Sequence, residues 1–449
     1  MTACLMESNA AVNSGEAPRP DGVDDTARTL GFKVRVRDQA RRAKGVDMAG
    51  WRRRVGYPLV FGAVGAATFA VVAAASSVLI ARKVLTPPRR RDEDVIVRAV
   101  APDASVITLS PTPESLLRGD YSFWFDHDAG HARLGPILSR SGVSVTRRVE
   151  RVSFGDLTRA KRGRISGWWY VRPEELGVPV KSIGIDTDGG VAPAWRFNAP
   201  KGDDGVRSGK WAIHVHGRGT QRQECLRAVP TFREHGWTSL VISYRNDGDG
   251  PRSDDGRYGL GSTEWRDVEA AIEYAVDHGA TDIVIMGWSM GGAIALQAVT
   301  RSPHSELIRG VVLDSPVIDW VDTLRYQAGE LHVPDPITES ALKILDAPWG
   351  GHLTGAAAPI GLPELDFVQR ADVLSTPILL LHSDDDGYVP AYASRALAAR
   401  RPDIVTFVRF TRARHTKLWN FDPKKWTKAI SRWLDQLDVG DGTPTPPGV

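Results

Sequence analysis

The sequence predicts an α/β fold, a mostly parallel β-sheet with helices on both faces, preceded by a single transmembrane helix. Two observations carry this prediction. From residue 211 onward, apolar runs of strand length alternate with amphipathic helical patterns, as in a parallel sheet that is buried on both faces. Earlier in the chain, 23 consecutive residues carry no charge, which is enough for a helix to cross a bilayer. With 449 residues, 42% of them apolar, the chain can bury a large core.

The uncharged run extends over residues 58–80 (PLVFGAVGAATFAVVAAASSVLI), with arginines at 52–54 before it and basic residues from 82 after it. Basic residues that stop abruptly at an apolar run are typical of the ends of a membrane span. We therefore expect a transmembrane helix at 57–81 that anchors a single-pass protein in a lipid membrane. A buried core helix rarely stays uncharged over this length, and a cleaved signal peptide would not follow so long a polar segment.

The flanks of the expected span do not predict its orientation. Residues 37–56 carry seven Lys and Arg and residues 81–100 carry six, so the asymmetry that sets orientation is missing and the side of the catalytic part stays open. Small residues along one helical stripe would let two copies of the span pack closely and self-associate. These residues are Gly62, Ala66, Ala70 and Ala74.

Most of the positive charge lies before the folded part. Residues 1–98 hold 17 Lys and Arg against 10 Asp and Glu, whereas the rest of the chain holds 40 against 44. Residues 1–56 lack apolar periodicity, and we interpret them as a disordered basic tail. A nucleic-acid-binding protein would carry its positive charge on the folded part, so we expect no nucleic-acid partner. The two cysteines, Cys4 and Cys225, exclude a disulfide scaffold.

Residues 82–163 form a β-rich N-terminal extension whose role the sequence does not assign. Gly and Pro separate short runs of β-branched and aromatic residues there and just beyond, which is typical of strands and turns. These strands are expected at 121–125, 143–152, 165–171 and 193–197. His127, Asp128 and His131 fall within one expected loop. Because no helix or strand would fix their geometry, we interpret them as a polar loop and expect no metal.

The alternating region supplies the sheet and its covering helices. Strands are expected at 211–215, 237–243, 282–288, 309–316, 377–383 and 404–410, and helices at 221–235, 262–279, 290–300 and 424–437. Ser262 or Thr263 is the expected N-cap of the second of these helices, and Gly279 is its expected stop. Residues 317–370 interrupt the alternation and are expected to form an inserted cap. Ligands of such sheets bind beyond the carboxyl ends of the strands.

One motif indicates chemistry. Gly287-Trp288-Ser289-Met290-Gly291-Gly292 lies between an apolar strand and an apolar helix, the context that a G-x-S-x-G turn requires. A serine in such a turn has a strained backbone and an exposed hydroxyl. The residues two before and two after it come so close that both must be glycine. We predict that Ser289 is a nucleophile; the alternative is a plain glycine turn between strand and helix.

A serine nucleophile needs a base and a group that orients the base. In this architecture the acid follows a late strand and the histidine comes last. The strand PILLLHS ends in DDDGYVP, in which Asp386 is the predicted acid and the two preceding aspartates are interpreted as turn residues. His415 begins the loop after the last strand and is the predicted base. Asp314, which ends another strand, is the less favoured acid.

An oxyanion hole is expected where the first parallel strand ends, in His216-Gly217-Arg218-Gly219. In this architecture one donor is the backbone N–H after the serine, here Met290, and the other comes from this earlier loop, here the N–H of Arg218. His216 is expected to brace the loop. The Arg218 side chain is expected either to contact a carboxylate or phosphate of the substrate or to face solvent.

These four motifs, HGRG, GWSMGG, HSDDDGYVP and ARHT, resemble the α/β-hydrolase superfamily over residues 164–438. The stretch 244–267 is similar to membrane-anchored bacterial members among the acyl hydrolases and the serine aminopeptidase-like proteins. The resemblance implies an α/β-hydrolase fold, a Ser-Asp-His triad and no cofactor. Residues 439–449 remain as an expected flexible tail.

The sequence therefore predicts a membrane-anchored serine hydrolase that cleaves carboxylic esters or related small-molecule acyl substrates through an acyl-enzyme. A serine peptidase or aminopeptidase, or an acyltransferase, on the same fold stays open. A catalytically silent binding module is disfavoured because all triad members occur in order. Since the triad and every strand of the sheet lie beyond them, residues 1–82 are expected to be dispensable for folding and activity.

Overall fold

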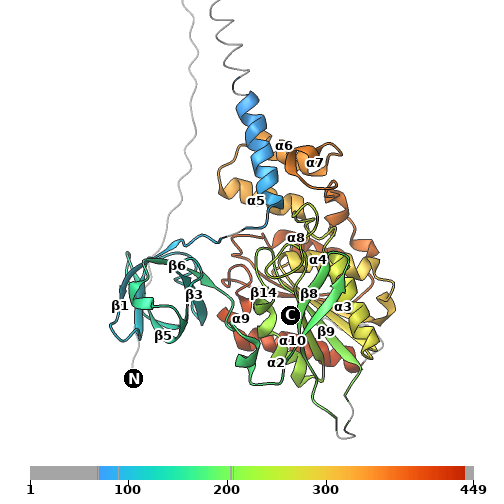
Figure 1. Ribbon diagram of the computed structural model, residues 1–449, viewed down its shortest axis with the longest axis horizontal. Helices are drawn as coiled ribbons and strands as arrows, with labels where there is room; N and C mark the ends of the chain where they lie inside the picture. The colour runs from blue at the N-terminus through green and yellow to red at the C-terminus, as the bar shows by residue number, and fades with distance from the viewer. Residues whose placement is uncertain (1–67, 69, 89, 203–204, 206, 440–449) are drawn as a thin grey trace, which may run out of the picture. The chain divides into compact units, whose positions relative to one another are not determined.

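The computed structural model describes residues 68, 70–88, 90–202, 205 and 207–439. They contain a helix at 70–85, a β-barrel, and a domain built on a large β-sheet, which we call the sheet domain (Figure 1). The expected tail at 1–56, Cys4 and residues 440–449 lie outside the described residues.

The barrel closes in the order β1-β2-β5-β4-β3-β6, because β1 pairs with both β2 and β6. Its strands are β1 (Val95–Val100), β2 (Val106–Leu109), β3 (Tyr121–Phe125), β4 (Gly130–Arg140), β5 (Val145–Phe154) and β6 (Arg162–Ser166). Tyr121, Phe123 and Phe125 alternate along β3 and belong to the buried barrel core. The sequence located β3 and most of β5 but not β1, β2 or β4. The expected boundary at 163/164 falls inside β6.

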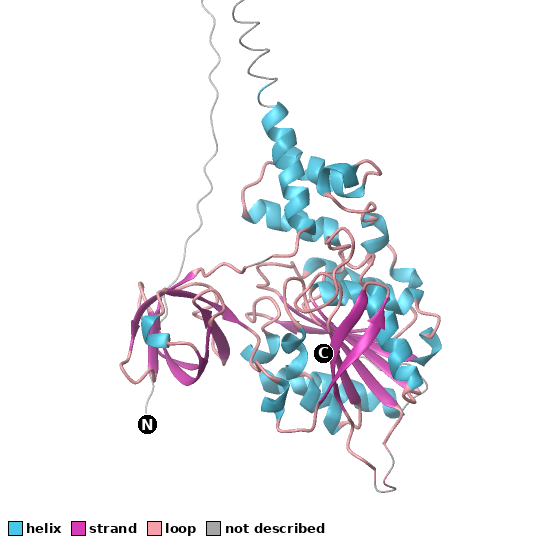
Figure 2. Cartoon of the chain, in the orientation of Figure 1, coloured by secondary structure: helices cyan, strands magenta, loops and turns pink. Residues whose placement is uncertain are grey.

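The sheet domain holds eight described strands in the order β14-β13-β12-β11-β9-β10-β8-β7 (Figure 2). They are β7 (Lys181–Thr187), β8 (Gly190–Phe197), β9 (Lys210–Val215), β10 (Thr238–Ile242), β11 (Asp282–Trp288), β12 (Ile308–Asp314), β13 (Ile378–Ser383) and β14 (Val405–Phe410). Strands β9 to β14 pair in parallel, whereas β8 runs antiparallel to β10 and β7. The parallel sheet follows the sequence prediction, and β7 is an addition to it.

Two apolar cores lie on opposite faces of this sheet. One packs against α3 (Trp265–Asp277), α4 (Met290–Arg301) and α8 (Tyr392–Arg400). The other packs against α2 (Val229–Glu234), α9 (Leu418–Phe421) and α10 (Pro423–Val439), with the fully buried Trp426 and Trp433 at its centre. Because both faces are covered, the strands are apolar along nearly their whole length.

The start of α3 differs from the expectation. Neither Ser262 nor Thr263 caps it; Glu264 occupies the N-cap position, and no side chain caps the first turn. Instead the buried Glu264 carboxylate accepts hydrogen bonds from the N–H groups of Gly259 (2.7 Å) and Gly261 (2.8 Å) in the preceding loop. Gly279, with φ at +86°, follows the last turn as expected.

The cap occupies the chain between β12 and β13. It contains α5 (Trp320–Glu330), α6 (Asp335–Asp346) and α7 (Gly350–Thr354), within the expected insertion at 317–370. The helix at 70–85, blue in Figure 1, lies against α5 and α6. Ser77 Oγ donates a hydrogen bond to the carbonyl of Ile337 (3.1 Å), and Ala81 and Leu85 are fully buried in the same core as the cap.

The expected membrane span lies only partly within the described residues. Residues 58–67 and 69 are outside them, while 68 and 70–80 are helical and the helix continues to residue 85. In the part of the chain that the structure describes, no helix combines the length and the apolarity needed to cross a bilayer. Of the small-residue stripe, Gly62 and Ala66 also lie outside the description.

The contacts of the helix correct the expectation that residues 1–82 are dispensable. Cutting there would remove Ser77 and Ala81 from the core and leave the turn before Leu85 unsupported. The helix at 70–85 is therefore part of the folded unit.

This packing can be tested with two leucines of the same helix. Leu85→Ala removes a fully buried side chain and should cost about 2–5 kcal/mol of stability. Leu79→Ala is the matched control, because Leu79 is 65% exposed. Thermal unfolding of the purified full chain should show a clear loss for the first variant and almost none for the second. Equal shifts would mean that the helix does not pack on the cap.

Candidate active site

The turn between β11 and α4 holds Ser289 in a strained conformation, with φ at +52° and ψ at −118°. A Cβ atom on Gly287 would lie 2.3 Å from the carbonyl oxygen of Gly291. A Cβ on Gly291 would lie 2.3 Å from the carbonyl oxygen of Val215 in β9. Only glycine fits at these two positions, and the close packing keeps the serine at the carboxyl edge of the sheet.

The three side chains that the sequence singled out form one hydrogen-bonded line. Ser289 Oγ lies 2.9 Å from His415 Nε2, and His415 Nδ1 lies 2.8 Å from Asp386 Oδ2. They come from the ends of β11, β14 and β13, which are brought to the same edge because these strands run in parallel.

The loop that carries His415 is fixed on both sides of the histidine. Arg414 and Thr416 both have positive φ values, of +58° and +50°. The Arg414 N–H donates to Asp385 Oδ1 (3.0 Å), and the Thr416 N–H donates to Ser315 Oγ (3.1 Å). These bonds hold the strained backbone so that the imidazole stays between its two partners.

Asp386 is nearly inaccessible and fully partnered. Its Oδ1 accepts hydrogen bonds from the N–H groups of Tyr388 and Val389, each 2.9 Å. Burial alone would raise the pKa of Asp386, but the charge and hydrogen bonds of His415 and His382 outweigh it and hold that pKa well below its usual range. The carboxylate of Asp386 is therefore charged near neutral pH.

His382 is a residue of the site that the sequence analysis missed. It is fully buried in β13, with Nδ1 2.8 Å from Ser394 Oγ and Nε2 3.0 Å from the carbonyl of Val389 and 3.3 Å from Asp386 Oδ2. It therefore supports Asp386 at the same carboxylate oxygen, Oδ2, that His415 contacts. A histidine inside the otherwise apolar strand LLLHS was the signal that could have revealed it.

The rival acid is bonded elsewhere. Asp314 Oδ2 accepts from Trp426 Nε1 (2.8 Å) and its Oδ1 from Ser315 Oγ (3.0 Å). Burial raises the pKa of Asp314. The Asp314 carboxylate thus binds the indole N–H of Trp426 in α10 and not the ring of His415. The two aspartates before Asp386 are turn residues, as expected, since they bind Ser383 and neighbouring arginines.

The loop His216–Gly219 lies against the serine turn. A Cβ placed on Gly217 would be 3.2 Å from the Cβ of Ser289. The N–H of Gly217 donates to Glu224 Oε2 (2.8 Å), and the N–H of Gly219 donates to Asp247 Oδ2 (2.6 Å). Between these two anchored groups, the backbone N–H of Arg218 has no hydrogen-bond partner among the described residues.

His216 braces this loop, in line with the expectation. It is fully buried, stacks on Tyr244 with ring centroids 4.2 Å apart, and has Nδ1 2.9 Å from the carbonyl of Gly217 and 3.1 Å from Thr220 Oγ1. Burial lowers the pKa of His216 to about 4, so the ring is neutral near pH 7. A neutral, packed ring gives the loop rigidity without adding charge.

The Arg218 side chain is half-buried and bonded within the chain, so it does not simply face solvent. Its Nη2 donates to the carbonyls of Val84 (2.8 Å), Lys83 (3.1 Å) and Thr86 (3.2 Å), at the C-terminal end of the helix at 70–85. Its guanidinium also lies 5.0 Å from the ring centroid of Tyr258. A cation there satisfies free helix carbonyls and complements the helix dipole. The interaction ties the helix to the loop beside the serine.

The loop with the two early histidines corrects another interpretation. His131 does not lie in a loop but on β4, where it is fully buried between Ser153 Oγ (2.9 Å) and Ser122 Oγ (2.8 Å). Burial lowers the pKa of His131 to about 3. Asp128 pairs instead with Arg164 (2.9 Å). Among the described residues, no three His, Cys, Asp or Glu side chains gather as a metal site.

A cavity of about 380 Å³ opens above the serine; we call it the catalytic pocket. Ser289, His415 and the loop at 217–219 line one part of it. Trp168, which follows the barrel, and Arg164 of β6 line another. Both folded parts therefore contribute to the site.

Comparisons with known proteins agree with this architecture. Residues 212–429 match the alpha/beta hydrolase family, and the sheet domain belongs to the α/β-hydrolase superfamily. Residues 96–166, which form the barrel, match a family described as a domain of unknown function. No protein of curated function matches the chain.

Solved structures with a similar fold include three esterases. The esterase Pf2001 of Pyrococcus furiosus is 19% identical, with a TM-score of 0.45, over 60% of this chain and 94% of its own. Est1E of Butyrivibrio proteoclasticus, solved with ferulic acid bound, is 20% identical over 57% and 100% of the two chains, with a TM-score of 0.44. The esterase EaEST of Exiguobacterium antarcticum is 15% identical over 57% and 100%, with a TM-score of 0.39.

The two buried aspartates should respond differently to amidation. Asp386→Asn should slow turnover of a p-nitrophenyl ester by roughly 10⁴-fold, because an amide favours the wrong tautomer of His415. Asp314→Asn should leave kcat near the wild-type value, because its partners are Trp426 and Ser315. Melting temperatures of both variants provide the control for folding. If Asp314→Asn alone abolished turnover, the assignment of the acid would be wrong.

Proposed function

We propose that this protein is a serine hydrolase that cleaves carboxylic esters through an acyl-enzyme. The observation that supports it is the hydrogen-bonded line from Ser289 through His415 to Asp386, with the serine in a strained turn at the edge of the sheet. Ser289 Oγ attacks the acyl carbonyl carbon as His415 Nε2 takes its proton. His415 then protonates the leaving alcohol, and Asp386 stabilises the imidazolium. Water, deprotonated by His415, releases the acid in the second half.

The oxyanion of each tetrahedral intermediate is held by the backbone N–H groups of Met290 and Arg218 in this proposal. Met290 begins α4, so its N–H is one of those that have no partner within the helix. The N–H of Arg218 is held in position by the bonds that its two neighbours make to Glu224 and Asp247. Two fixed donors of this kind are worth several kcal/mol in the transition state.

A serine peptidase or an acyltransferase would use the same acyl-enzyme and differ in the leaving group or the acceptor. No contact of the described residues favours either over an esterase. A silent binding module would need no strained serine within 2.9 Å of a histidine. A panel of p-nitrophenyl esters and aminoacyl p-nitroanilides distinguishes these outcomes.

The nucleophile is tested directly with a fluorophosphonate probe. Wild-type protein should be labelled at Ser289, and Ser289→Ala should lose both the label and ester hydrolysis, the latter by roughly 10⁵–10⁶-fold. Its melting temperature should stay near that of the wild type, because the hydroxyl does not support the core. Ser340→Ala is the matched control, at an exposed serine of α6 that does not line the catalytic pocket. A label that persists on another serine would contradict the assignment.

We also propose that the apolar run at 58–80 anchors the protein as a single membrane span, with its residues before Ser77 in the bilayer and the turn from Ser77 onward packed on the cap. The uncharged length and its basic flanks support this proposal. The full chain should then stay in the membrane fraction through an alkaline carbonate wash. Ala70→Arg should impair insertion, because a central arginine costs about 2.5–3.5 kcal/mol on the insertion scale. Ala70→Leu is the control, and a wild-type chain found wholly in the soluble fraction would overturn the anchor.

A further inference from the structure

We propose that the substrate is an amphiphilic ester, with a long apolar acyl chain on one side of the scissile carbonyl and an anionic, phosphate-bearing alcohol on the other. This inference rests on the proposed esterase function and specifies its substrate class. Two further cavities, one apolar and one rich in arginine, adjoin the catalytic pocket from different directions, and their linings carry the argument.

The apolar cavity has a volume of about 720 Å³, within the range of pockets that enclose small molecules. Its walls are apolar side chains of three helices. They are Leu79, Ile80 and Val84 of the helix at 70–85, Leu324, Ala328 and Leu331 in and after α5, and Ala341, Leu342 and Leu345 of α6. The charged side chains of Lys83 and Arg218 also line it, and Arg218 is already bound to the helix carbonyls. A hydrocarbon chain therefore fits this cavity, because a polar group would find few partners there.

This cavity adjoins the catalytic pocket. Pro88, Arg218 and Tyr388 line both, so the apolar cavity begins at the loop that supplies the oxyanion donor. An acyl chain whose carbonyl lies at Ser289 can thus extend between the cap and the helix at 70–85.

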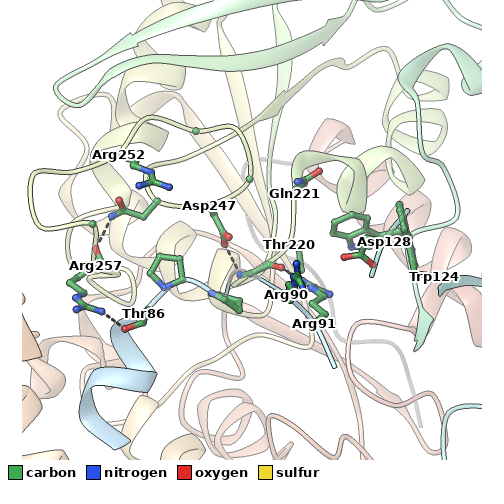
Figure 3. A pocket seen from close by; sticks show the side chains of 18 of the residues that line it. Thr86, Arg90, Arg91, Trp124, Asp128, Thr220, Gln221, Asp247, Arg252 and Arg257 are labelled. Atoms are coloured by element: carbon green, nitrogen blue, oxygen red, sulfur yellow. Dashed lines mark hydrogen bonds between the residues drawn. The ribbon is translucent and has the colours of Figure 1, made fainter. Parts of the chain in front are cut away.

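The second cavity, of about 790 Å³, is shown in Figure 3 and is called the arginine pocket. Five arginines and three aspartates are among the described residues that line it: Arg90, Arg91, Arg164, Arg252, Arg257, Asp128, Asp247 and Asp255. In the figure, Arg252 and Arg257 lie on one side, and Arg90, Arg91, Asp128 and Trp124 lie on the other. Cations outnumber carboxylates, so the pocket favours an anion.

The three aspartates do not neutralise this excess. Asp128 pairs with Arg164, and Asp255 accepts from Ser253 Oγ and from the N–H of Ala357. Asp247 accepts from the N–H of Gly219, and burial raises the pKa of Asp247 to about 7, so part of it is uncharged near neutral pH. The carboxylates therefore reduce the excess of positive charge in the pocket without cancelling it.

Arg164 places a nearly buried guanidinium between two of the cavities. Its side chain is only 9% exposed, and its Nε is buried without a hydrogen-bond partner among the described residues. The guanidinium lines both the arginine pocket and the catalytic pocket. Phosphate oxygens suit such planar donors.

The positions of His415 and Lys417 decide which half of the ester is anionic. Both line the catalytic pocket together with Arg90, Arg91 and Arg164. His415 must protonate the leaving alcohol, so that alcohol leaves on the side where the cations gather. The apolar cavity is not lined by His415 and receives the acyl chain. The fitting substrate is a fatty-acyl ester of a phosphorylated alcohol, as in an anionic lysophospholipid.

The head-group half is tested with two esters of the same chain, a monoacylglycerol phosphate and the uncharged monoacylglycerol. We expect wild-type kcat/KM to favour the phosphate by about tenfold or more, and rising salt to reduce the preference. Arg90→Gln, which removes no hydrogen bond of the described residues, should lower the preference severalfold. Arg98→Gln, an exposed arginine of β1 outside the three cavities, should not. Equal rates for both esters would overturn the anionic half.

The chain half is tested with p-nitrophenyl esters from acetyl to dodecanoyl. Each added methylene should raise kcat/KM by about two- to fourfold until the cavity is filled. Ala328→Trp places an indole in the apolar cavity and should lower kcat/KM for the dodecanoyl ester at least tenfold more than for the acetyl ester. Glu330→Trp, exposed on the same helix and outside the cavity, should leave the ratio unchanged. A flat chain-length profile in the wild type would overturn the apolar half.

Fluorophosphonate labelling separates failure of this inference from failure of the esterase itself. If wild-type protein is labelled at Ser289 but shows neither preference, the substrate class is wrong and the esterase function stands. If it is not labelled and hydrolyses no ester, the proposed esterase function is wrong, and the substrate class inferred from the cavities is wrong with it.

Discussion

The close packing of the serine turn against its neighbouring strand is the constraint on which the site depends. Ser289 has a positive φ, which a non-glycine residue adopts only when the surrounding structure enforces it. The enforcement comes from two glycines that let α4 approach β9 and β11 to near contact. Any side chain at either position would move the helix away from the sheet and with it the N–H groups at its start. Ser289 and the N–H of Met290, one of the proposed oxyanion donors, therefore both depend on this close packing of α4 against the sheet.

The loop at 216–219 joins this turn to the rest of the chain. Glu224 and Asp247 hold it from within the sheet domain, Arg91 bonds to the carbonyl of Gly219 from the segment before the barrel, and Arg218 binds the end of the helix at 70–85. The loop beside the serine thus forms hydrogen bonds with three segments that are far apart in sequence. This explains why a helix near the apolar run belongs to the folded unit, although it contributes no catalytic group.

The barrel and the cap give the site its chemical asymmetry. The barrel contributes Arg164 and Trp124, and the cap contributes apolar helix faces, so the cavities on either side of the catalytic pocket differ in charge. The barrel also contacts the histidine loop, where Glu114 pairs with Arg414 (3.2 Å). The sheet fixes the positions of Ser289, His415 and Asp386, while the barrel and the cap line the cavities around them.

The sequence by itself determined the parallel sheet and the three aligned side chains, because both depend on local patterns. Apolar strands alternating with helices specify a sheet covered on two faces, and a glycine-flanked serine between them specifies the turn. Only the tertiary structure decided the role of Arg218, the support of Asp386 by His382, and the burial of His131 in a closed barrel. Arg218 with Val84 and β1 with β6 pair across long sequence distances, and His382 meets Asp386 because the turn after β13 brings the two side chains together. Such contacts produce no periodic pattern in the sequence, because an arginine or a histidine at the same position could equally face solvent or lie in a loop.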